Sequence, residues 1–188
     1  TVIEPSAHDA ATVYLAANVG LTVAPGGRII AEGTEDKPIY FTRAPGATTH
    51  GGTITINGMP GAPETHLYHV FFNFGGEPAV VCTDNSNVIL DYCEWLDTEL
   101  EYLHLDGGSF IVSNCIFPSA APNALFEGVH GNGDLPVGGR AIVRDSFFGK
   151  MQGYNDVIDF TGGNRPETVF QVYNNVFIGS GDDILDID

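Results

Sequence analysis

The chain has 188 residues, of which 43% are hydrophobic, and a formal net charge of −17 with only seven Lys and Arg. This length fits one domain with a sizeable core. The scarcity of basic residues excludes nucleic acid as a partner, because phosphate binding needs a basic surface. No stretch approaches the roughly 18 apolar residues of a membrane-spanning helix, so we expect no membrane insertion either.

Glycine and proline are frequent, at 24 and 11 residues, and predict many turns. Long runs of strong helix formers are missing, so the composition indicates an all-β protein. Three cysteines, Cys82, Cys93 and Cys115, do not make a disulfide framework.

The first predicted strands lie between residues 15 and 65. The stretch L-T-V-A-P-G-G-R-I-I-A-E-G-T-E-D-K-P-I-Y-F-T-R (21–43) reads as three short strands separated by P-G-G, E-G-T and D-K-P. Such Gly- and Pro-containing breaks mark turns. We interpret residues 15–65 as the opening coils of a repeating structure, and residues 66–188 as its main part.

A pattern then recurs at steps of 23, 22, 31 and 29 residues. The repeated segments are L-Y-H-V-F-F (67–72), L-D-Y-C-E-W (90–95), V-S-N-C-I-F (112–117), V-R-D-S-F-F (143–148) and V-Y-N-N-V-F (172–177). Alignment gives one column of Val70, Cys93, Cys115, Ser146 and Asn175. It gives a second, aromatic column of Phe72, Trp95, Phe117, Phe148 and Phe177. We expect the aromatic column to form a core ladder at the strand spacing of about 4.8 Å.

Each repeated segment is followed by a second short strand with alternating apolar residues. These predicted strands are A-V-V-C-T (79–83), Y-L-H-L-D (102–106), L-F-E-G-V (125–129), V-I-D-F-T (157–161) and I-L-D-I-D (184–188). Short strands in a repeat of 22 to 31 residues indicate a solenoid, in which each coil buries its apolar face on the next.

The stretch A-E-G-T-E-D-K-P-I-Y-F-T (31–42) resembles the opening coils of secreted bacterial right-handed parallel β-helix proteins. The N-C-I-F and N-N-V-F endings of later coils are similar to coils of the pectate-lyase-like superfamily. The resemblance implies a single right-handed parallel β-helix domain over residues 1–188, secreted or on the cell surface. The abrupt strand at Asp188 leads us to expect that the natural protein continues and that the last coil is an open edge for self-association.

One column of polar residues, three of them carboxylates, recurs on the predicted second strands. His104, Glu127, Asp159 and Asp186 recur at 23, 32 and 27 residues and face outward. Stacked carboxylates about 5 Å apart repel by roughly 3 kcal/mol at an effective dielectric near 20. The column is therefore a solvated face, a Ca²⁺ site of Glu127, Asp159 and Asp186, or a set of catalytic acids.

The catalytic hypothesis rests on a second resemblance. Asn155-Asp156 and Gly181-Asp182-Asp183 resemble two motifs of polygalacturonase-type hydrolases on this fold. The resemblance implies Asp182 as general acid, with Asp156 and Asp183 activating water on the other face of the sugar. The V-H-G at 129–131 lies in an earlier coil than the Gly-His-Gly of that family.

Four residues are candidates for substrate binding. Tyr154 is the preferred exposed aromatic, because pyranose rings stack on flat side chains, and Asn155 adjoins it. Arg165, in G-G-N-R-P, could reach the acidic column, and His104 shares the face of the acids. No pair of histidines has the spacing of a zinc site, so the sequence does not predict a transition-metal centre.

Three loops rich in Gly and Pro, 58–66, 119–124 and 131–139, are expected to wall a groove, because loops on a rigid scaffold commonly carry function. The sequence thus favours carbohydrate recognition by an extracellular β-helix, as a binding module of a larger polysaccharide-degrading protein. A glycoside hydrolase and a structural or adhesin segment are the alternatives.

Overall fold

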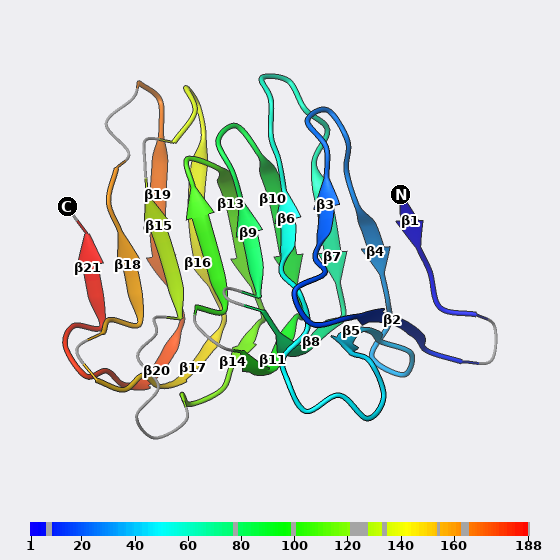
Figure 1. Cartoon of the computed structure of the whole chain (residues 1–188). Coiled ribbons are helices and arrows are strands. Elements are labelled where there is room, and N and C mark those ends of the chain that lie inside the picture. Colours follow the sequence, from blue (N-terminus) through cyan, green and yellow to red (C-terminus); the bar gives the residue numbers. More distant parts are fainter. Residues whose placement is uncertain are drawn as a thin grey trace.

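Three parallel β-sheets of seven strands each build the whole described structure, a computed structural model of the chain (Figure 1). The structure describes residues 1–6, 9–76, 79–98, 101–120, 128–132, 135–153, 155–162 and 166–187. Within these ranges there is no helix, so none is long and apolar enough to cross a membrane. The predicted β-solenoid is confirmed as a parallel β-helix.

Every coil contributes one strand to each sheet, and the sheets are named here in the order in which the chain visits them. Sheet A holds β1 (Val2–Ile3), β4 (Ile30–Glu32), β7 (Thr65–Tyr68), β10 (Asn87–Asp91), β13 (Ser109–Ser113), β16 (Arg140–Arg144) and β19 (Val169–Tyr173). Sheet B holds β2 (Ala11–Leu15), β5 (Ile39–Arg43), β8 (Val70–Gly75), β11 (Glu94–Thr98), β14 (Ile116–Phe117), β17 (Phe147–Lys150) and β20 (Val176–Gly179). Sheet C holds β3 (Leu21–Val23), β6 (Ile54–Ile56), β9 (Val80–Cys82), β12 (Leu103–Asp106), β15 (Val129–Asn132), β18 (Ile158–Phe160) and β21 (Leu185–Ile187).

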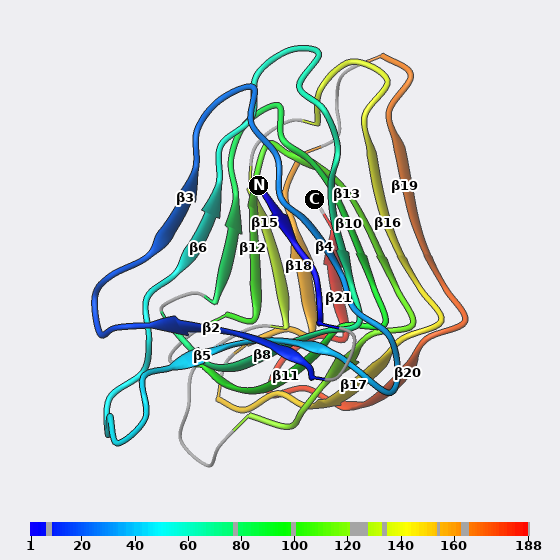
Figure 2. The same ribbon diagram turned by 90° about the vertical axis from the view of Figure 1, so that its right-hand side faces the viewer.

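The seven coils stack in chain order, so that β1–β3 form coil 1 and β19–β21 form coil 7. Figure 2 looks along this stack and shows the three sheets as the sides of a triangle. Coil 1 already contains Val2–Ile3, so regular structure starts before the predicted residue 15.

The repeated hexapeptides turn out to span a corner between two sheets. In each, the third residue has a left-handed backbone that turns the chain from sheet A into sheet B. These corner residues are His69 (φ 49°), Tyr92 (φ 53°), Asn114 (φ 52°), Asp145 (φ 52°) and Asn174 (φ 56°). Asn and Asp adopt this conformation more readily than other residues with a side chain, which explains why they recur there.

The predicted aromatic ladder is confirmed and extends one rung further, to Phe41. Ring centroids along Phe41, Phe72, Trp95, Phe117, Phe148 and Phe177 are separated by 5.8, 5.0, 4.4, 4.5 and 5.1 Å in that order. Every pair is stacked, because parallel strands in register hold equivalent side chains one strand spacing apart. This ladder is the centre of the core.

One strand differs from its prediction. We expected L-F-E-G-V (125–129) to be the second strand of coil 5, but β15 begins only at Val129, and Val129 pairs with Leu103. The coil is therefore longer between sheets B and C than the repeat step predicted. Glu127 itself lies outside the described residues.

The three cysteines are buried free thiols. Burial raises the pKa of Cys82 to about 12, and it also raises the pKa of Cys115, which contacts Cys93. Since the thiolate is the reactive form, we expect almost no reaction of the folded protein with a disulfide reagent at pH 8, and three reactive thiols per chain in denaturant. Thiol counting with and without urea tests this, and a thiol that reacts rapidly in the folded state would contradict it.

Candidate functional site

The outward face of sheet C carries the predicted polar column, with one member changed. The residues in register are Thr22, Thr55, Val81, His104, His130, Asp159 and Asp186. The outward positions of His104, Asp159 and Asp186 agree with the predicted alternation. The rung after His104 belongs to His130, however, so the prediction of Glu127 there is wrong.

Two histidines and a glutamate meet on this face, and we call Glu101, His104 and His130 the Glu–His cluster. Oε1 of Glu101 lies 3.5 Å from Nδ1 of His130 and 3.9 Å from Nδ1 of His104. The two imidazole rings are 4.8 Å apart, tilted by 34°. One ligand atom from each residue lies within 4.8 Å of the others, close enough to meet around one cation.

Local chain geometry explains why sequence alternation missed Glu101. Counting back from His104 in steps of two does not reach Glu101, so a straight strand would place it on the opposite face. The chain bends at Tyr102, whose ring is buried against Trp95 and Phe117. The bend brings Glu101 to the side of His104.

The Glu101 carboxyl is an unusual acid. The residue is 9% exposed, and burial by itself raises its pKa. The polar contacts to His104 and His130 outweigh burial and hold the pKa of Glu101 at about 2, below the ordinary 4.5. The carboxylate is therefore charged over the whole physiological range, with the histidines as its partners.

This depressed pKa predicts a pH dependence of stability. The carboxylate stabilises the folded state fully above the unfolded pKa near 4.5, and that contribution is lost as the pH falls toward about 2. We expect Glu101→Gln to lower the free energy of unfolding near pH 6, with the gap to wild type closing between pH 4.5 and pH 2. Denaturant melts across this range in chelator-containing buffer measure the gap. Parallel curves for the two proteins would contradict the assignment.

The proposed catalytic aspartates lie at the turns before β18 and β21, on adjacent coils. Oδ1 of Asp156 accepts a 2.7 Å hydrogen bond from the backbone N–H of Asp183, and Asp156 is buried. Asp182 and Asp183 are exposed. The structure thus brings the two motifs side by side, and gives Asp156 a role in joining the coils.

The glycine of the G-D-D motif has a structural reason. A Cβ on Gly181 would lie within 1.6 Å of the backbone oxygen of Gly153. The N–H groups of Gly181 and Asp182 donate to the carbonyl of Asn155. Glycine is needed at this close approach of two coils, whether or not the acids act on a substrate.

Of the four residues predicted to bind substrate, the structure describes only His104 and Asn155. Tyr154 and Arg165 lie outside the described residues. The side chain of Asn155 donates to the carbonyl of Gln152, and Asn155 lies two coils from His104. The two described candidates therefore do not lie on the same coil.

A cleft of about 550 Å³ opens where the chain turns from sheet C into sheet A, and we call it the loop cleft. It is lined by Pro60, Gly61, Ala62, Asn85, Ser86, Asn87, Ser109, Pro136, Val137, Gly138, Gly139 and Arg140. Figure 1 shows the cause: the long β6–β7 connection extends beyond the sheets, while the turns β9–β10 and β12–β13 are short. The predicted loops 58–66 and 131–139 thus supply the two walls of one cleft.

Arg140 stands at the edge of the loop cleft and is held in place. Its Nη2 lies 3.0 Å from Oε2 of Glu64, and its backbone N–H donates to Oγ of Ser109. The guanidinium has five N–H donors in a rigid fork, so an ion pair with Glu64 leaves donors for a ligand. The cleft combines such polar groups with exposed apolar surface from Val137 and Pro60.

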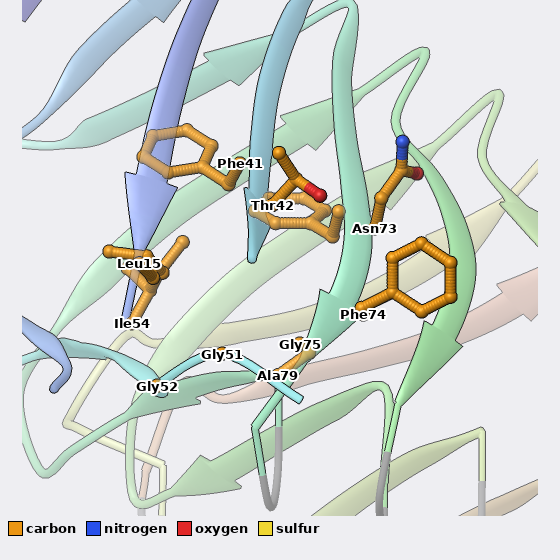
Figure 3. Close-up of a pocket in the computed structure, with 11 residues that line it drawn as sticks. Leu15, Phe41, Thr42, Gly51, Gly52, Ile54, Asn73, Phe74, Gly75 and Ala79 are labelled. Carbon is orange, nitrogen blue, oxygen red and sulfur yellow. The ribbon is translucent and has the colours of Figure 1, made fainter. Parts of the chain in front are cut away.

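A second hollow, between sheets B and C, is too small for a ligand. It encloses about 10 Å³ and is lined mainly by apolar residues and close-packed glycines, with Thr42 and Asn73 at its side (Figure 3). Leu15, Phe41 and Ile54 contribute side chains to it. A space of this size holds at most about one water molecule. We interpret it as imperfect packing at a corner of the coils.

Among the described residues, the exposed Tyr92 and Tyr173 do not form one continuous face. Tyr92 lies at a corner, stacked on His69 at 4.9 Å and edge-on to Tyr68 at 5.6 Å. Tyr173 is exposed in sheet A, in the column that continues through Arg144. The two tyrosines therefore occupy different columns.

Comparison with known proteins found no matching family model, no similar curated protein and no similar solved structure.

Proposed function

We propose that this protein recognises a neutral polysaccharide, which it binds in the loop cleft. The observation that carries the proposal is the cleft itself, walled by loops from separate coils of a stiff solenoid. Its volume of about 550 Å³ falls within the range of small-ligand sites. Loops on a rigid scaffold are the usual place for recognition.

The composition of the cleft suits sugar hydroxyls and ring faces. Asn85 and Asn87 offer side-chain amides, and Arg140 offers further donors. Val137 and the prolines offer apolar surface for the C–H faces of a pyranose. This mixture of few polar groups and apolar walls is typical of ligand sites.

Charge selects the class of glycan. The net charge of −17 repels polyuronates and other anionic chains at long range. A neutral chain meets no such barrier. We further propose that the protein acts outside the cell, as a binding module of a polysaccharide-degrading protein; this part of the proposal rests on the resemblance of its coil motifs to the pectate-lyase-like superfamily.

A binding screen tests the proposal. Neutral gluco-, manno- and galacto-oligosaccharides of three to six units are titrated calorimetrically into the whole chain, beside oligogalacturonates with and without Ca²⁺. We expect at least one neutral series to bind, and to bind more tightly as the chain lengthens to fill the cleft. Binding of oligogalacturonates alone would contradict the proposal.

Glycoside hydrolysis is the second candidate, favoured by one observation. Asn155-Asp156 and Gly181-Asp182-Asp183 lie on adjacent coils, joined by the bond from Asp183 to Asp156. The carboxylate of Asp156 is occupied by that bond, which argues for a structural part. Release of reducing ends from the same oligosaccharides, abolished in Asp182→Asn, would favour the hydrolase over the binding module.

A further inference from the structure

We infer that the Glu–His cluster is a binding site for one divalent transition-metal ion, with Zn²⁺ as its most fitting probe. The inference is independent of the loop cleft, because the cluster lies on the outer face of sheet C. The donors are two imidazole nitrogens, from His104 and His130, and a carboxylate oxygen from Glu101. Two histidines and one carboxylate are a common ligand set for Zn²⁺ with an open fourth position.

The two distances from the glutamate oxygen to the histidine nitrogens are already close to those around a metal. Four ligands arranged tetrahedrally at about 2.1 Å from Zn²⁺ lie about 3.4 Å from one another. Oε1 of Glu101 is 3.5 Å from Nδ1 of His130 and 3.9 Å from Nδ1 of His104. All three ligand atoms lie within 4.8 Å of one another, so side-chain rotations that draw them together would complete a coordination geometry.

The scaffold holds the three donors before any ion arrives. His104 and His130 are paired partners on neighbouring strands, β12 and β15, so their Cα positions are set by the sheet. Glu101 is anchored by the bend at Tyr102, whose hydroxyl donates to the carbonyl of Pro118. Preorganisation of this kind lowers the entropic cost of binding.

Burial of the carboxylate supplies a second, separate argument. Oε2 of Glu101 is buried and, among the residues that the structure describes, has no hydrogen-bond partner. A buried charge with unsatisfied oxygen atoms is costly unless a cation compensates it. A divalent ion compensates it more fully than the two imidazoles alone can.

The choice of ion follows from the corrected column. With Glu127 as a rung, the face would have offered mainly oxygen ligands, which suit Ca²⁺. With His130 there, two nitrogens stand beside one carboxylate, and imidazole favours Zn²⁺ and related ions. Asp159 pairs with His130 on the next strand and is the candidate for an additional ligand. The outward column of sheet C contains only two carboxylates, Asp159 and Asp186, that could serve as ligands for Ca²⁺.

The experiment titrates ZnCl₂ into the chelator-treated whole chain at pH 7.5 and follows heat and melting temperature. We expect one high-affinity ion per chain and a raised melting temperature in wild type. His130→Ala and Glu101→Gln should each weaken binding at least tenfold. Co²⁺ in place of Zn²⁺ should give visible absorption bands that the two variants lose. Circular dichroism confirms that each variant is folded before it is titrated.

His66→Ala is the matched control. His66 forms a histidine–carboxylate pair with Glu32 at 2.9 Å, and this pair is exposed. Among the described residues, the pair does not belong to a group of three possible metal ligands. The control should bind Zn²⁺ like wild type. Equal affinities in all variants would assign the ion to scattered surface acids and overturn the inference. So would an absence of Zn²⁺ binding at millimolar concentration, or binding of Ca²⁺ in preference to Zn²⁺.

Discussion

Replacing Trp95 by alanine is expected to lower the free energy of unfolding by about 3–5 kcal/mol. Trp95 is 1% exposed and stacks between Phe72 at 5.0 Å and Phe117 at 4.4 Å, at the middle of the aromatic ladder. Removing it leaves a cavity that the neighbouring rungs cannot fill, because the strands on both sides hold them in register. Denaturant-induced unfolding followed by circular dichroism measures the loss.

The neighbouring residue provides the control for this prediction. Leu96 follows Trp95 in β11 but is 54% exposed. Leu96→Ala also removes an apolar side chain from β11, but this side chain contributes little buried area. We therefore expect the free energy of unfolding to change by no more than about 0.5 kcal/mol. Similar losses for the two variants would mean that the ladder is not the main source of stability.

Arg140→Ala is expected to weaken binding of a neutral oligosaccharide by roughly 10- to 100-fold. Hydrogen bonds to charged groups contribute about 1.5–3 kcal/mol, and each 1.4 kcal/mol changes affinity about tenfold. Arg140 is the one arginine among the residues that line the loop cleft. Isothermal titration with the tightest-binding oligosaccharide measures the change.

Arg144 makes an unusually close control for Arg140. Both arginines belong to β16. The side chain of Arg144 is 40% exposed and is paired with Asp145, and that of Arg140 is 42% exposed and is paired with Glu64. They lie at opposite ends of the strand, and only Arg140 reaches the cleft. Each surface pair is worth about 0–1 kcal/mol of stability, so both variants should fold. An equal loss of affinity in the two would contradict a site in the loop cleft.

The repeat predicted the parts of the fold that depend on stacking. The aromatic column from Phe72 to Phe177 was visible because each coil must bury its face on the next, and the chain reuses the same residue type at each rung. His104, Asp159 and Asp186 were placed correctly on the outer face for the same reason. Alternation along a short strand is enough to assign the face of a residue when the strand is straight.

The errors arose where the chain leaves the regular strands. Glu127 was predicted as a rung because the step from His104 matched the other coils, but β15 starts later and His130 takes the position. Glu101 was missed because a bend reverses the alternation. A cluster of side chains brought together by loop length and bends has no periodic signal, so only the structure shows the Glu–His cluster.

The most direct test of the proposed function maps the bound glycan onto the chain. Backbone amide chemical shifts are recorded by NMR with and without a saturating neutral oligosaccharide. We predict that the largest changes fall on residues 60–62, 85–87 and 136–140, around the loop cleft. Changes centred on Asp156 and Asp182, on the exposed tyrosines, or no change with any neutral oligosaccharide would contradict the account.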